Sequence, residues 1–108
     1  TASRQLNLPL LTATDTIAPT VSITAPLNNS IVAKRSIVTI TAMATDNVGV
    51  TQVRFYVNSS LKCTDGITPY TCAWKVGGKP GATYRLKAQA SDAAGRIGYS
   101  TPVTVVGR

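Results

Sequence analysis

The sequence predicts an all-β fold, an antiparallel β-sandwich of about seven strands. Three observations support this fold class. Apolar and polar residues alternate with a period of two through most of the chain, and no stretch has the apolar period of an amphipathic helix. Val, Ile and Thr, which favour strands, are abundant. Gly, Pro, Asn and Asp gather between the alternating stretches, where they would form turns.

The N-terminal half contains three predicted strands. Residues 21–24 alternate Val and Ile with Ser and Thr, and the turn sequence A-P-L-N-N-S follows at 25–30. Residues 36–45 place Val, Ile and Ala on one face and Thr on the other. Residues 50–58 place Val and Phe inward and direct Arg and Tyr outward. Each strand therefore has one apolar face, which a second layer has to cover.

The C-terminal half contains four further predicted strands. A short strand begins at residue 61, and residues 70–74 place Tyr, Cys and Trp on one face. Residues 83–91 alternate Tyr, Leu and Ala with Arg, Lys and Gln, and residues 103–105 supply the last strand. Seven short alternating strands separated by turns are typical of an Ig-like topology. Tyr84, near the start of its strand, fits a tyrosine corner, whose hydroxyl bonds to nearby backbone.

We expect one domain, because 108 residues can bury one modest core but not two independent ones. Residues 1–14 hold four leucines and Pro9, which interrupts any helix. We interpret 1–14 as an arm packed on this domain or as the tail of a preceding domain, and 15–108 as the β-domain. No run approaches the roughly eighteen apolar residues of a membrane span, so no membrane insertion is expected.

The two cysteines, Cys63 and Cys72, flank the turn-rich sequence T-D-G-I-T-P-Y-T. Their spacing fits neither a C-x-x-C redox motif nor a zinc site, and the chain has no His to complete one. We predict a disulfide that staples two adjacent strands and stabilises by roughly 2–3 kcal/mol. A disulfide implies an oxidising compartment, so we expect a secreted or periplasmic protein.

The chain is strongly basic, with eleven Lys and Arg residues against four Asp and no Glu, giving a net charge of +7. This charge suits a polyanionic partner, such as an acidic glycan, an anionic cell surface or nucleic acid. The alternative is a soluble β-domain whose acidic neighbours lie elsewhere in a longer protein. Composition alone leaves both interpretations open.

Catalysis is not expected of this domain. It lacks His and Glu, the commonest general acids and bases, and cysteines committed to a disulfide cannot act as nucleophiles. No phosphate-binding loop, H-E-x-x-H or G-x-S-x-G motif occurs. We therefore predict that the domain is not an enzyme, although the protein that carries it can be a secreted hydrolase or lyase.

Two of the four carboxylates recur in one frame, A-[TS]-D-x-x-G, at Asp46 and Asp92. Because successive antiparallel strands alternate in direction, Asp46, Asp65 and Asp92 should lie at one end of the sandwich, together with Asp15. A cluster of carboxylates there has the oxygens that a Ca²⁺ site needs. The alternative, which we favour, is that each Asp closes its own loop by accepting backbone N–H bonds, with no cofactor.

Four outward-facing residues define a candidate binding surface, the basic–aromatic face: Arg54, Tyr56, Arg85 and Lys87. They come from two strands that pair in Ig-like sheets. The cations can hold sulfate, carboxylate or phosphate, and Tyr56 can stack on a sugar or a base. The alternative is an ordinary exposed face that long charged side chains keep soluble. We expect no nucleic acid, because no reading helix and no pair of stacking aromatics is evident.

Most of the other cations should lie near the pole opposite the carboxylates: Lys34, Arg35, Lys62, Lys75, Lys79 and Arg108.

An ordered set of motifs in this chain resembles the bacterial Ig-like domains: D-x-x-A-P-T-V, A-T-D-N-V-G-V, V-x-F-Y-V, P-Y-x-x-x-W and A-x-A-x-D-A-A-G. The resemblance runs from about residue 15 to residue 106. It implies a noncatalytic spacer, stability or attachment module on secreted proteases, glycoside hydrolases, lyases or adhesins. The chain departs from the family in its cysteine pair, since members often carry few cysteines, and in its positive charge, since members are often acidic.

These observations together predict an extracellular accessory or spacer module that supports a neighbouring catalytic or adhesive domain of a larger bacterial protein. The alternative function is adhesion to a carbohydrate or anionic surface through the basic–aromatic face. The expected partners are neighbouring domains of the same chain and an anionic glycan or cell surface, and the isolated domain should be a monomer.

Overall fold

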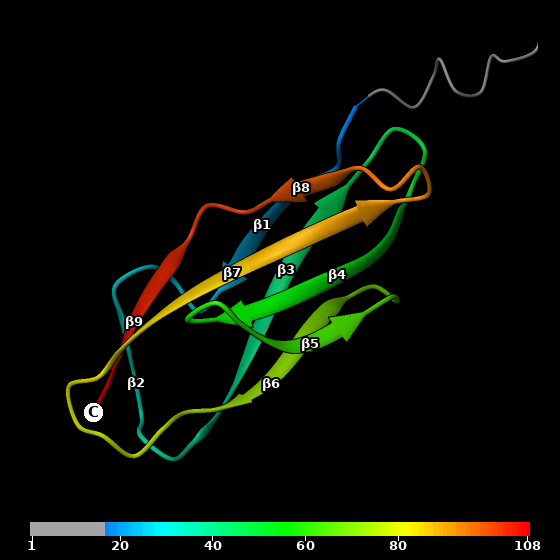
Figure 1. The fold of residues 1–108 in the computed structure, drawn as a ribbon. Coiled ribbons are helices and arrows are strands. Elements are labelled where there is room, and N and C mark those ends of the chain that lie inside the picture. The colour runs from blue at the N-terminus through cyan, green and yellow to red at the C-terminus, as the bar shows by residue number, and fades with distance from the viewer. Residues whose placement is uncertain (1–16) are drawn as a thin grey trace, which may run out of the picture.

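The computed structural model describes residues 17–108, which form nine strands and no helix (Figure 1). The strands are β1 (Thr20–Ala25), β2 (Ser30–Val32), β3 (Ile37–Thr45), β4 (Val50–Val57), β5 (Ser60–Asp65), β6 (Tyr70–Lys75), β7 (Thr83–Asp92), β8 (Ile97–Tyr99) and β9 (Val103–Gly107). The predicted arm at 1–14 and the predicted site residue Asp15 lie outside the described residues. This part of the chain contains no helix that is long and apolar enough to cross a membrane.

The strands form two sheets, and the predicted all-β sandwich is confirmed. One sheet has the order β1-β3-β6, and the other has the order β2-β9-β7-β4-β5, with β8 also paired to β7. Every pairing is antiparallel except that of β2 with β9, which is parallel. The seven predicted strands correspond to β1, β3–β7 and β9. The prediction missed β2 and β8, since a strand of three residues is too short to show alternation.

The core lies between the two sheets and takes alternate residues from each strand. Phe55, Leu86 and Val105 are completely buried, as are the small residues Ala88 and Ala90. The inward faces predicted from the period-two pattern are therefore confirmed. The buried apolar residues are Val32, Ile40, Ala42, Val53, Phe55, Val57, Tyr70, Cys72, Trp74, Val76, Leu86, Ala88, Ala90, Val103 and Val105.

The last strand is interrupted at Ser100, so that β8 and β9 pair with different parts of β7. Ser100 is buried, its backbone N–H donates to the Ala88 carbonyl at 2.9 Å, and its Oγ accepts from the Ala88 N–H at 2.8 Å. The hydroxyl thus replaces a ladder carbonyl where the chain leaves the regular strand. Pro102, which follows, has no N–H to offer a ladder. This bond satisfies the buried N–H of Ala88, which would otherwise be costly.

The two ends of the sandwich differ in the loops they carry. The β3–β4, β5–β6 and β7–β8 loops point toward the same end, as the pairing of Val50 with Asp92 and of Val53 with Asp65 indicates, with the β5–β6 loop set back along β4 (Figure 1). We call this the acidic end. The β2–β3 and β6–β7 loops meet at the other, the basic end, where β9 also finishes.

Candidate functional site

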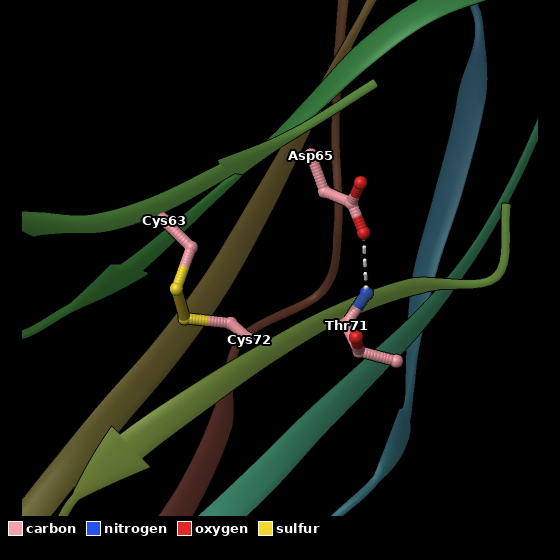
Figure 2. The surroundings of a disulfide bond; sticks show 4 residues. All are labelled: Cys63, Asp65, Thr71 and Cys72. Atoms are coloured by element: carbon pink, nitrogen blue, oxygen red, sulfur yellow. Dashed lines mark hydrogen bonds between the residues drawn. A yellow bond between two sulfur atoms is a disulfide. The ribbon is translucent and has the colours of Figure 1, made fainter. Parts of the chain in front are cut away.

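The predicted disulfide between Cys63 and Cys72 is present, with the two Cα atoms 5.7 Å apart (Figure 2). Cys63 belongs to β5 and Cys72 to β6, two strands that follow each other in the chain but lie in different sheets. The prediction of two adjacent strands therefore needs refinement, because the bond links the edge of one sheet to the edge of the other. It closes one side of the sandwich covalently.

Asp65 closes the loop that the disulfide spans. Its Oδ1 accepts a bond from the Ile67 N–H and its Oδ2 accepts one from the Thr71 N–H, both at 3.1 Å. Figure 2 shows the second of these bonds beside the two cysteines. The carboxylate therefore holds β5 and β6 together next to the covalent bond.

The two repeated motifs form two loops that an Asp side chain closes in similar ways. Asp46 Oδ2 accepts from the N–H groups of Val48 and Gly49, both at 3.1 Å. Asp92 Oδ1 accepts from the N–H groups two and four residues on, at 3.0 and 2.9 Å. Gly49 and Gly95 both have positive φ, +145° and +85°, a conformation that favours glycine. Each loop thus has the geometry of an Asx turn.

The acidic end holds the three described carboxylates, as strand alternation predicts, but they are engaged separately. Within residues 17–108 no three His, Cys, Asp or Glu side chains are grouped so as to hold a metal ion. Asp46 Oδ1 and Asp92 Oδ2 are buried without a hydrogen-bond partner. A calcium site that includes Asp15 stays a prediction, because that residue lies outside the described part of the chain.

The basic–aromatic face is assembled on two neighbouring strands. Tyr56 of β4 is the register partner of Lys87 of β7, and Arg54 and Arg85 lie two residues from this pair on the same two strands. The residues between them along the strands are fully or almost fully buried, so the four side chains share the outer face of the sheet. Arg85 is exposed, and the other three are half-buried. The structure therefore brings together all four of the predicted binding residues.

Gln52 holds Arg54 on this face. With its amide turned so that Oε1 faces the guanidinium, the oxygen accepts from Arg54 Nη2 at 3.0 Å and from Nε at 3.3 Å. An Arg held in this way offers its remaining N–H groups in a fixed direction.

Most of the remaining described cations lie toward the basic end, whereas Arg96 lies in the β7–β8 loop at the acidic end. The Lys34 N–H donates to the Arg108 carbonyl at 3.2 Å and the Arg35 N–H to the Val76 carbonyl at 3.1 Å, which ties together the β2–β3 loop, the end of β9 and the segment that follows Lys75. The carboxylates and most of the cations consequently occupy opposite ends of one sandwich. Charge is segregated along its length.

Sequence reasoning missed two polar side chains that position the site. Ser100 completes the β7 ladder, and Asn58 Oδ1 accepts from the Arg85 N–H at 2.8 Å. The sequence S-T-P after a short apolar stretch was the available signal for the first, since Pro marks an interrupted strand. Tyr84, the predicted tyrosine corner, packs edge-on against Trp74 with ring centroids 4.9 Å apart.

Two sheets, antiparallel except for the β2–β9 pair, pack face to face, and the chain crosses between them in this order, which defines the class of immunoglobulin-like β-sandwich modules. Within that class, the chain belongs to the bacterial Ig domain family, whose sequence profile matches residues 19–88.

The chain is also similar to a solved structure of the fibronectin(III)-like modules of Clostridium thermocellum CbhA. The TM-score is 0.74 at 28% sequence identity, and the match covers 81% of this chain and 93% of that one. No curated protein matches this chain. Modules of this class are generally noncatalytic, and those with a disulfide are typical of extracellular proteins.

Proposed function

We propose that this domain is a noncatalytic extracellular module that holds a neighbouring catalytic or adhesive domain of a larger bacterial protein at a set distance. The observation that carries the proposal is the direction of the chain through the fold. β1 begins at the acidic end and β9 finishes at the basic end (Figure 1). Thr20 and Arg108 are thus separated by about the length of the longer strands, about 30 Å.

The test replaces residues 17–108 of the protein that carries the module with a flexible Gly/Ser linker of equal residue number. A spacer should leave the neighbour's chemistry on a small soluble substrate unchanged, while the distance between the flanking parts becomes broadly distributed in small-angle scattering or fluorescence transfer. Loss of that chemistry in the replaced protein, or turnover by the isolated module, would contradict the proposal. The second outcome would assign catalysis to the domain itself.

A second candidate function, attachment to an anionic surface, is favoured by the assembly of Arg54, Tyr56, Arg85 and Lys87 on one face. An array of cations beside an aromatic ring can bind the charged groups and the ring faces of an acidic glycan. The test is retention on immobilised heparin with salt elution. Replacing the three cations of the face with Ala should give earlier elution than replacing Lys34, Lys79 and Arg108 of the basic end. Equal elution of both triple variants and the parent would remove this candidate.

A further inference from the structure

The turn between β4 and β5 stands at the border of two basic clefts. It consists of Asn58 and Ser59, with φ values of 49° and 71°, as in the two-residue turns that match the twist of a hairpin. Both the backbone and the side chain of Asn58 bond to Arg85 of β7. The Asn58 N–H donates to the Arg85 carbonyl at 2.9 Å, and Asn58 Oδ1 accepts from the Arg85 N–H at 2.8 Å. These two bonds therefore hold the turn rigidly against β7.

The first cleft, of about 400 Å³, lies on the outer side of this turn and is lined by Asn58, Ser59, Arg85 and Lys87. The second, of about 320 Å³, shares Asn58 and continues on the other side, where Lys62 and Lys75 line it. We call them the outer cleft and the inner cleft. Each has two cations, and the shared residue places the two clefts next to each other.

The charged groups that line the two clefts are all hydrogen-bond donors, and the Ser59, Ser60 and Tyr84 hydroxyls can donate as well as accept. Asn58 Oδ1 is occupied by the Arg85 N–H, so the amide NH₂ is the part of this side chain left for a ligand. Lys and Arg side chains can only donate. Within residues 17–108 no carboxylate lines either cleft, and the three described carboxylates lie at the acidic end. The site is complementary to negative charge on both sides of the turn.

The inner cleft also has an aromatic floor. Tyr84, which is half-buried, forms most of this floor, and it meets the almost fully buried Trp74 edge to face, with the ring planes at 70°. Gly77 keeps the floor open, since a Cβ there would lie 2.7 Å from the Tyr84 hydroxyl. An apolar aromatic surface beside a few placed donors is the usual composition of a site for a small organic group.

We propose that the outer and inner clefts bind successive anionic groups of one linear acidic polysaccharide, with the Asn58–Ser59 turn between them. The inference rests on the second candidate function and adds Asn58, Lys62 and Lys75 to its residues. A carboxylate or a sulfate on a sugar suits each pair of cations, and the aromatic floor suits a sugar ring. A nucleic acid fits less well, because the rings of the inner cleft meet edge to face instead of offering stacking platforms for successive bases.

The test is calorimetric titration of the folded domain with defined oligosaccharides at low and physiological salt. Tetragalacturonate carries carboxylates alone and a heparin tetrasaccharide carries sulfates as well, so tighter binding of the heparin fragment assigns a preference for sulfate. Galacturonic acid, cellotetraose and oligo(dT) serve as the single-charge, neutral and nucleic-acid probes. We expect an acidic tetrasaccharide to bind at least about tenfold more tightly than the single acidic sugar, since one ligand engages both clefts.

Paired variants locate the site. Arg85→Ala with Lys87→Ala removes the cations of the outer cleft, and Lys62→Ala with Lys75→Ala removes those of the inner cleft. Each pair should weaken tetrasaccharide binding about tenfold. The matched control, Lys34→Ala with Lys79→Ala, changes the net charge equally at exposed positions outside both clefts, and should weaken binding less than about twofold. Circular dichroism verifies that every variant is folded.

Each other result overturns the proposal in a distinguishable way. If the control pair Lys34→Ala with Lys79→Ala weakened tetrasaccharide binding as much as the cleft pairs, the binding would reflect general charge attraction. If galacturonic acid bound as tightly as the acidic tetrasaccharide, the domain would have one anion site instead of two. Tighter binding of oligo(dT) would assign the clefts to nucleic acid. Binding lost with Arg54→Ala and Tyr56→Ala but kept in the Lys62/Lys75 pair would leave the second candidate function standing without the clefts. If no probe bound, both the two-cleft proposal and the second candidate function would be wrong, and the proposed spacer function would not be affected.

Discussion

Cutting the Cys63–Cys72 bond with a reductant, without changing a residue, should lower the stability of the sandwich by about 2.7 kcal/mol at 25 °C. The value follows from the loop that the bond closes, because the two cysteines are nine positions apart. Closing a loop of about ten residues removes roughly 9 cal/mol/K of entropy from the unfolded chain. For a domain of this size the loss corresponds to a fall in Tm of about 11–21 °C.

The loss should also be uneven across the fold. β5 pairs with β4 alone and β6 with β3 alone, so reduction leaves these two edge strands joined by side-chain packing and the Asp65 bonds. β7, with strands paired on both sides, keeps its ladder. Hydrogen exchange should therefore show the amides of β5 and β6 losing protection before those of β7.

The assay compares thermal and urea unfolding of the oxidised and reduced protein. The double variant Cys63→Ala with Cys72→Ala supplies the control, since the reductant should not change its Tm. A Tm that moves by less than about 2 °C on reduction, worth less than about 0.5 kcal/mol, would refute the loop-entropy reasoning. If the amides of the reduced protein lost protection uniformly, the prediction that β5 and β6 open before β7 would be wrong.

Three further substitutions test the fold by calorimetric or urea unfolding. Gly98→Ala should destabilise by about 3 kcal/mol, because a methyl group there would overlap the carbonyl of Pro19; an unchanged midpoint would show that the start of β1 can move away at no cost. Ser100→Ala should cost about 1–3 kcal/mol by leaving the buried Ala88 N–H unpaired, and a neutral effect would mean that a water takes the place of the hydroxyl. Ser59→Gly should stabilise by about 0.5 kcal/mol, since the left-handed φ strains a side chain more than the added chain entropy costs; a loss of stability would contradict that balance.

The long strands could be predicted because their alternation is local. Residues 83–91 show their buried and exposed faces without any knowledge of the partner strand, and β7 agrees with them. β2 could not be predicted in the same way, because its three residues are strand only through parallel pairing with Val105–Gly107 at the far end of the chain. The disulfide was predictable from its flanking turn. That it joins two sheets depends on the topology, since β5 pairs with β4 and β6 with β3.

The candidate site was predictable to the extent that alternation and strand order determine it. Arg54, Tyr56, Arg85 and Lys87 follow from facing directions on two strands that pair. The inner cleft does not follow, because the register of β4 and β5 shifts between Phe55 and Tyr56 and leaves Lys62 as the extra residue of a bulge. A register shift of one residue changes the face on which a side chain lies. The local sequence pattern does not indicate that such a shift occurs or where it occurs.

The parallel pairing of β2 with β9 has a consequence for a chain that is pulled from its two ends. In an antiparallel hairpin pulled at its open end, hydrogen bonds break one after another. Here Ser30–Val32 runs in the same direction as Val105–Gly107. A force on the C-terminal end pulls β9 toward the basic end, and the opposing force acts on β2 through β1. The two forces would therefore slide the two strands past each other. The bonds of the ladder, with those of Lys34 and Arg108 beyond it, would then bear the load together. We expect such a domain to transmit tension while it stays folded, which is what a tether between a cell surface and its target needs.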